Sequence, residues 1–321
     1  MEKKEIGKVK LFIMLFFAGL SFFYLSIYYL VWRLFSFVVN LICVKIVRNT
    51  DGKLETPIVF YEHPVTKRMV AFIAMIHLAE PEYYSALNRR IKLLSGYKIL
   101  FEGIGRLSKR ENKFLTQEER DVFHDFDSRL KLLKKIGNIM LLKYQKDKGG
   151  LFYDLSWVNN DIRLYDFIKS SAKQNLCFVK EEKKLYASLD DESMQLFSKW
   201  LNNMMFSQFL PAIVVANIIG FFFKNERLIN KLILDARNEE AMRGINKYLA
   251  KGNVALIWGA MHLVGIGKEL KRAGFREVRR EWFTAYHVRD YHLFESLKKE
   301  GIINTFKEAA NSIMLLKKDL T

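Results

Sequence analysis

The sequence predicts an α/β domain made of two related strand–helix–strand halves, with a transmembrane helix before it. Two stretches, 70–105 and 254–283, repeat one pattern and predict the domain. Each opens with a short apolar run rich in branched residues, which is typical of a buried strand. Each then continues through a histidine, a helical stretch and a glycine to a second strand-like run. An uncharged segment near the N-terminus predicts the transmembrane helix.

A histidine ends the first strand of each half. His77 lies in the sequence Met-Ile-His-Leu, and His262 lies in Ala-Met-His-Leu. The order of elements in each half indicates a parallel pair of strands joined by a helix. Ligands of open α/β sheets bind beyond the carboxyl ends of the strands. If the halves pack side by side, the two histidines face one another, and converging imidazoles suit a metal site or an acid–base site.

Length and composition set broad limits on the function. The chain has 321 residues, half of them apolar, which is enough for one large domain or two modest ones. Its 52 Lys and Arg exceed its 35 Asp and Glu, but the excess is spread along the chain and no nucleic-acid module occurs. We therefore expect no nucleic-acid partner, and attraction to anionic lipid instead. The two cysteines, Cys43 and Cys177, predict neither a disulfide framework nor a CxxC metal pair.

The N-terminus has the features of an uncleaved membrane anchor. Residues 1–10 form a basic flank with four lysines, and residues 11–32 carry no charge. A helix of these 22 residues is long enough to cross a bilayer, and no cleavage site of small residues follows it. We assign 11–47 to the anchor region, with a buried hydrophobic helix as the alternative. Basic residues flank the segment almost equally, so charge leaves the side of the membrane open.

The rest of the chain, 57–321, forms the predicted domain after a polar link at 50–56. Residues 58–61 and 69–76 are expected to pair as a hairpin. A second apolar run, 204–223, is long enough to span a membrane. A single extra crossing would place the two histidines on opposite sides, so we expect a core, interfacial or re-entrant element instead. Helices are expected at 81–94, 118–133, 161–172, 190–205, 226–249 and 303–317.

Several local motifs resemble those of the TraB/PrgY/GumN group, which includes the TIKI proteases. That family carries two G-x-x-H motifs at strand ends, an acidic residue after the first unit, an Arg-Asn pair followed by Met, and a D-[LV]-S element. The counterparts here are Ala74–His77, Glu102, Asp154–Ser156, Arg237-Asn238 with Met242, and Gly259–His262. The first motif departs from the family pattern, because Ala74 replaces the usual glycine. The resemblance covers roughly residues 57–285.

The resemblance implies an α/β domain of two related halves, with the paired histidines and the acidic residue at its centre. For the TIKI members it implies metal-dependent peptide cleavage on the outer side of a membrane anchor. For this chain it implies a single-pass protein of a bacterial inner membrane, with the domain outside the cytoplasm. Ala74 is expected to alter or weaken the site, because glycine lets the backbone approach a ligand closely.

His77, His262 and Glu102 are the candidate metal ligands. Two imidazoles and a carboxylate suit a divalent cation such as Mn, Co or Zn, with one position left for water. Such an ion lowers the pKa of its bound water and polarises a carbonyl. The alternatives are core histidines and a surface carboxylate. Glu80 and Glu82 are reserve ligands because they follow His77 closely.

Arg237 and Asn238 are candidates for stabilising the negative charge that develops on a substrate oxygen. An exposed pair on a helix is the alternative. Asp154 either orients a histidine by a hydrogen bond, without itself contacting the metal, or forms a cap or turn. We expect the remaining histidines to be structural or exposed; they are His63, His124, His287 and His292. No G-x-S-x-G, P-loop or H-E-x-x-H motif occurs, which argues against the common hydrolase and nucleotide sites.

We therefore expect a membrane-anchored, metal-dependent hydrolase that acts on peptide bonds. Its expected catalytic residues are His77, Glu102, Arg237, Asn238 and His262. The alternative is a membrane-bound protein that binds or sequesters a peptide or protein partner without cleaving it. The sequence leaves the substrate, the metal, the side of the membrane and the oligomeric state open.

Overall fold

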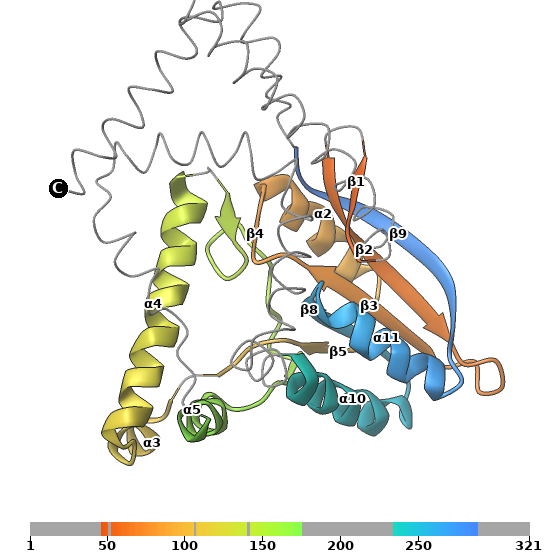
Figure 1. Cartoon of the computed structure of the whole chain (residues 1–321). Coiled ribbons are helices and arrows are strands. Elements are labelled where there is room, and N and C mark those ends of the chain that lie inside the picture. The colour runs from red at the N-terminus through yellow and green to blue at the C-terminus, as the bar shows by residue number, and fades with distance from the viewer. Residues whose placement is uncertain (1–45, 51–52, 106, 140–141, 175–233, 288–321) are drawn as a thin grey trace, which may run out of the picture.

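The computed structural model describes residues 46–50, 53–105, 107–139, 142–174 and 234–287 (Figure 1). Several expected features lie outside these ranges: nearly all of the anchor region, the second apolar run, both cysteines and the helices expected at 190–205 and 303–317. Within the described ranges, no helix is both long and apolar enough to cross a bilayer.

The described residues form a mixed α/β fold, as the sequence predicts, around one seven-stranded sheet. Its strands, in spatial order, are β1 (Arg48–Thr50), β2 (Lys53–Glu62), β3 (Met69–Met75), β8 (Asn253–Gly259), β5 (Tyr97–Phe101) and β7 (Val158–Asn159). The seventh, β9 (Arg276–His287), pairs with β2 along its whole length. β3, β8, β5 and β7 run parallel, whereas β2 is antiparallel to its neighbours. A separate two-stranded sheet joins β4 (Leu78–Ala79) to β6 (Lys143–Tyr144).

The first hairpin is confirmed, but the sheet begins earlier in the chain than expected. β2 and β3 pair antiparallel, with Ile58 opposite Ile73. The polar link expected at 50–56 is wrong, because most of it belongs to β1 and β2. Leu54 and Thr56 are almost completely buried, as alternate residues of a strand with one inward face must be. The polar composition of this short segment conceals the alternation.

The two halves interleave instead of forming separate parallel pairs. β3 and β8, their first strands, are direct neighbours, with Ala74 opposite Trp258 and Met75 opposite Gly259. β8 also pairs with β5, so it separates the two strands of the first half. β9, the last strand of the second half, pairs with β2 and not with β8. The two strands of each half are parallel, as expected, but they are not neighbours in the sheet.

Burial explains why the strands take these places. Residues Val254–Trp258 of β8 are all buried, which suits a strand covered on both faces in the middle of a sheet. β9 instead begins with the exposed sequence Arg-Glu-Val-Arg. Charged residues of this kind are typical of an edge strand, where they discourage further pairing.

Helices cover both faces of the sheet (Figure 1). The described helices are α2 (Pro81–Lys92), α3 (Lys109–Lys113), α4 (Gln117–Ile139), α5 (Leu164–Lys173), α10 (Ala236–Leu249) and α11 (His262–Arg272). On β9, Glu281 accepts a hydrogen bond from Arg90 of α2, while the adjacent Arg280 lines a groove beside α11. Adjacent strand residues point to opposite faces, so α2 and α11 lie on opposite sides of the sheet. α10 lies beside α11 (Figure 1) and packs against β8.

A second, smaller apolar cluster lies among the helices away from the sheet. The charged stretch expected to be helical is α4, which extends past 118–133 to Ile139. Val122 of α4 belongs to a buried cluster with Phe167 and Ile168 of α5. This part of the chain is therefore packed on one side and not solvated all round.

The contact between α10 and the chain after β7 fixes the position of that helix. Asn160 donates a hydrogen bond from Nδ2 to the carbonyl of Glu240 at 2.9 Å, and its backbone N–H donates to Phe101 at 3.1 Å. The side chain lies so close to α10 that a Cβ at Gly244 would stand 2.0 Å from its Oδ1. Only glycine at 244 permits this approach.

Gly244→Ala should lower the free energy of unfolding by about 1–3 kcal/mol, because overpacking outweighs the roughly 1 kcal/mol that alanine gains over glycine in a helix. Gly252→Ala is the matched control, since a Cβ there meets nothing within 4 Å. Urea unfolding of the full chain in detergent, followed by tryptophan fluorescence, measures both variants. Equal midpoints would contradict the close packing of α10 on Asn160.

Candidate functional site

The candidate site lies where three parallel strands end. Glu102 directly follows β5, His77 follows β3 by two residues, and His262 is the first residue of α11 after β8. Because β3, β8 and β5 are adjacent and parallel, their carboxyl ends meet at one edge of the sheet. The fold therefore brings the three residues that the sequence predicts as ligands to one region.

Glu102 is held by two donors, one for each carboxylate oxygen. Oε1 accepts a hydrogen bond from Nη2 of Arg237 at 2.5 Å, and Oε2 accepts from the backbone N–H of Gly259 at 2.5 Å. A Cβ at 259 would stand 3.1 Å from Oε2, so the glycine of the intact motif allows this contact. Burial alone would raise the pKa of Glu102, but Arg237, His77, His262 and the Gly259 N–H outweigh it and lower the pKa to about 2.

A second carboxylate, Asp161, completes the cluster around Arg237. Its Oδ1 accepts from Nε at 2.9 Å and its Oδ2 accepts from Nη2 at 2.6 Å, in the two-point geometry that arginine favours. The side chain is fully buried and also accepts backbone N–H bonds from Gly103 and Ile162. Burial alone would lower the pKa of Arg237, but the two carboxylates outweigh it and raise the pKa. From the local sequence, Asp161 is expected only as the start of a helix.

His262 is buried, with 3% of its surface exposed, and its ring is fixed from two sides. Nδ1 lies 2.7 Å from Oδ1 of Asn238, and the ring stands edge-on to Trp258 with centroids 5.0 Å apart. An amide oxygen only accepts, so Nδ1 carries the proton and Nε2 keeps its lone pair. Burial lowers the pKa of His262 to about 4, helped by Arg237 and His77 and opposed by Glu102. The imidazole is therefore neutral at neutral pH.

His77 differs from His262 because it is exposed. Its backbone carbonyl accepts a hydrogen bond from Gln145, which ties it to the chain after α4. When it is protonated, its charge is among the influences that lower the pKa values of Glu102 and His262. One histidine thus faces solvent while the other lies inside. Ala74, which replaces the expected glycine, is buried in β3 and its carbonyl accepts from the Tyr83 hydroxyl at 3.2 Å.

Three aromatic residues at the site were not predicted. The guanidinium of Arg237 stands 5.5 Å from the centre of the Trp258 ring, and the indole N–H of Trp258 has no hydrogen-bond partner among the described residues. Burial, with a smaller effect of the Glu102 charge, raises the pKa values of Tyr144 and Tyr153. Aromatic residues are common in any core, so local sequence provides no signal for their place here.

Several other candidate residues have ordinary structural roles. Asp154 is exposed and accepts from the backbone N–H of Ser156 at 2.8 Å, which favours its turn alternative. Glu80, a reserve ligand, pairs with His287 at 2.8 Å. Glu82 lies in the first turn of α2, where a negative charge favours the helix. His63 accepts backbone N–H bonds in the β2–β3 turn, His124 is exposed on α4, and His292 lies outside the described ranges.

The donor arrangement does not fit a metal centre formed by His77, His262 and Glu102. Both oxygens of Glu102 already accept hydrogen bonds, and the Arg237 cation beside it would repel a divalent ion. In the part of the chain that the structure describes, no group of three or more His, Cys, Asp or Glu residues is placed to hold a metal ion.

Comparison of the chain with protein-family models, with curated proteins and with solved structures gave no significant match. The fold and the site thus define a mixed α/β protein with a buried carboxylate–guanidinium cluster beside a neutral histidine.

The free energy of unfolding should fall as the pH falls from about 6.5 to about 4. The folded pKa of His262 lies near 4, against the ordinary value of 6.5, so the unfolded chain binds the proton first in this window. The loss is on the order of 3 kcal/mol, since each pH unit between the two pKa values contributes about 1.4 kcal/mol.

His262→Gln removes the titrating ring and should flatten this part of the curve, whereas His124→Gln, on the exposed face of α4, should leave it unchanged. Urea unfolding at several pH values measures the slope. The same slope in wild type and His262→Gln would contradict a buried neutral imidazole.

Proposed function

We propose that the protein is a membrane-anchored hydrolase that acts on peptide bonds, as its resemblance to the TraB/PrgY/GumN group implies, but without the metal ion that the resemblance also implies. The proposal includes an N-terminal transmembrane helix and two related halves whose first strands pair. The observation that carries it is the placement of a neutral, oriented histidine near an ionised carboxylate at the carboxyl ends of parallel strands. Buried groups whose pKa values are pushed apart are frequent at catalytic sites.

The two histidines suit different parts of a hydrolytic step. His77, at the open side, takes the proton from an attacking water and returns it to the leaving amine. His262 accepts a hydrogen bond from the same water through Nε2, because its Nδ1 is occupied by Asn238. The water oxygen then forms a bond to the peptide carbonyl carbon, and the C–N bond breaks as the amine receives its proton. Glu102 stabilises positive charge that develops on either ring.

Arg237 and Asn238 support these groups and do not contact the substrate in this proposal. Nε and Nη2 of Arg237 are already bonded to carboxylates, and Oδ1 of Asn238 is bonded to His262. Their expected role at the substrate oxygen is therefore replaced by a positioning role. Arg237 fixes Glu102, and Asn238 fixes the tautomer of His262.

A second candidate function is binding without cleavage. The observation in its favour is the complete engagement of Glu102 and Asp161 by protein donors, which is also how a purely structural ion cluster is built. A domain of this kind would hold a peptide or partner at the same edge of the sheet, with the exposed His77 as a contact residue.

Cleavage of a fluorescence-quenched peptide library by the full chain in detergent separates these functions. The wild type should cleave, and His77→Ala and His262→Gln should each lower kcat/KM at least 100-fold, the usual effect of losing an acid–base group. His124→Gln, an exposed histidine away from the site, is the matched control and should keep full activity.

Binding of peptides without cleavage, or full activity in His77→Ala, would contradict the hydrolase. A chelation arm tests the metal separately. We expect activity to survive EDTA; activity that is lost and restored by Mn or Zn would mean that Glu102 leaves Arg237 to bind an ion. Unfolding midpoints of each variant ensure that lost activity does not reflect lost structure.

A further inference from the structure

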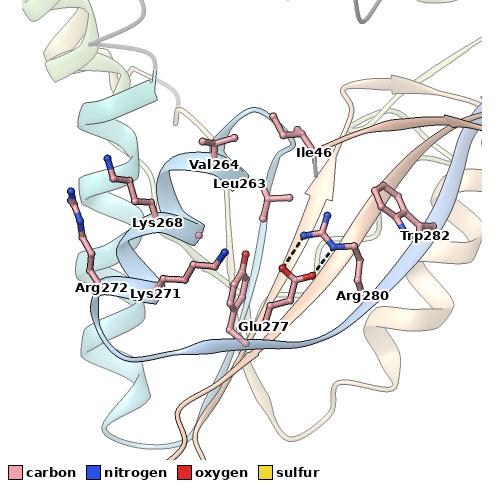
Figure 2. A pocket seen from close by; sticks show the side chains of 11 residues that line it. Ile46, Leu263, Val264, Lys268, Lys271, Arg272, Glu277, Arg280 and Trp282 are labelled. Atoms are coloured by element: carbon pink, nitrogen blue, oxygen red, sulfur yellow. Dashed lines mark hydrogen bonds and ion pairs between the residues drawn. The ribbon is translucent and has the colours of Figure 1, made fainter. Parts of the chain in front are cut away.

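A groove of about 750 Å³ lies between α11 and the β2–β9 edge of the sheet (Figure 2), and none of the candidate site residues lines it. Leu263 and Val264, from the first turn of α11, line one wall, and Trp282 of β9 lines the other. Tyr61 of β2 also lines the groove, and burial, with the nearby Glu277 charge, raises its pKa to about 12. A volume of this size is within the range of small-ligand sites.

The rim of the groove is strongly basic. Lys268, Lys271 and Arg272 of α11 line it from one side, and Arg280 of β9 from the other (Figure 2). Glu277 is the carboxylate among the lining residues, and it is paired with Arg280 at 2.8 Å.

The lysines carry positive charge that the described part of the chain does not offset. Arg272 pairs with Glu269, but Lys268 and Lys271 are exposed and form no ion pair with a described residue. A basic last turn favours any helix, which accounts for Lys271 without a ligand. Lys268 lies before that turn and gains little from the helix dipole, so its place at the rim has no such explanation.

The place of the groove in the chain indicates where its ligand would come from. Ile46, which lines it, is next to the end of the segment 11–47 that the sequence predicts to be the membrane anchor. The groove therefore lies where the anchor region joins the domain, 14 residues after the expected span of 11–32. Val264, at its edge, exposes 57% of its surface, so apolar and basic surfaces adjoin there.

We propose that this groove binds an anionic phospholipid of the membrane in which the chain is anchored. Lys268 and Lys271 bind the phosphodiester through charge-assisted hydrogen bonds, and the first acyl carbons rest on Leu263 and Val264. The proposal rests on the membrane anchor of the proposed function, but not on hydrolysis, since the groove contains none of the candidate catalytic residues.

Calorimetric titration of the full chain in an uncharged detergent tests the proposal with three soluble probes: dihexanoyl phosphatidylglycerol, dihexanoyl phosphatidylcholine and glycerol phosphate. Phosphatidylglycerol should bind saturably, the zwitterionic lipid much more weakly, and glycerol phosphate at least ten-fold more weakly because it lacks the acyl chains. Lys268→Gln with Lys271→Gln should weaken phosphatidylglycerol binding roughly 30-fold, the effect expected for two basic residues at an anionic surface.

The matched control is Lys109→Gln with Lys113→Gln, which removes two exposed lysines from α3, and it should bind as the wild type does. Val264→Ser should weaken the lipid but not glycerol phosphate. Equal binding of both lipids, wild-type affinity in the groove variant, or glycerol phosphate binding as tightly as the lipid would overturn the proposal. So would binding of none of the three. Because this experiment measures lipid binding, lipid binding can be absent while peptide cleavage is found, and lipid binding can be found while cleavage is absent.

Discussion

The structure depends on one buried cation, Arg237, shared by two carboxylates that come from different parts of the chain. Burying an unpaired charge costs several kcal/mol, so each member requires the others to be in place. Arg237 comes from α10, Glu102 from the end of β5 and Asp161 from the segment after β7. The backbone N–H of Gly259 in β8 bonds the Glu102 oxygen that Arg237 does not contact, and two loop N–H groups add further bonds to the Asp161 oxygens. The cluster therefore ties a helix, two strand ends and a loop into one arrangement, and the histidine is placed against it.

The interleaving of strands determines which histidine adjoins this cluster. Because β8 lies between β3 and β5, the backbone N–H of Glu102 bonds to Ile257 of β8, and its side chain reaches Gly259 at the end of the same strand. Had each half formed its own parallel pair, Glu102 would have ended beside β3 and His77. Because β8 lies between β3 and β5, Glu102 instead lies beside the second G-x-x-H motif, where Gly259 leaves room for its carboxylate. The degenerate first motif has no such contact to accommodate, which is a physical reason why Ala74 is tolerated.

The sequence predicts those features of the fold and site that depend on residues close together in the chain. The local patterns are the strand runs, the two histidines at strand ends and the carboxylate after β5. They correctly indicate that the site lies at the carboxyl ends of the parallel strands. Asp161 bonds to Arg237 across 76 positions, and nothing around it distinguishes a buried ion partner from a helix start. Strand order is equally non-local, since the same strand–helix–strand pattern permits another strand between its members. The prediction of a polar link at 50–56 is wrong for a different reason: two inward-facing residues are too few to reveal the alternation of a strand.

The helix α11 belongs to both the candidate site and the groove, and its packing limits how they influence each other. His262 begins it at the candidate site, and Leu263 and Val264 follow at once in the groove. A lipid bound there would contact the same turn that holds the imidazole. Ile266 and Leu270 are fully buried against the sheet, and Asn238 bonds the histidine from α10, so the helix is held along its length. Close-packed interiors resist small displacements. A ligand of the groove would therefore orient the domain on the bilayer, and so set where the site opens, without shifting the histidine itself.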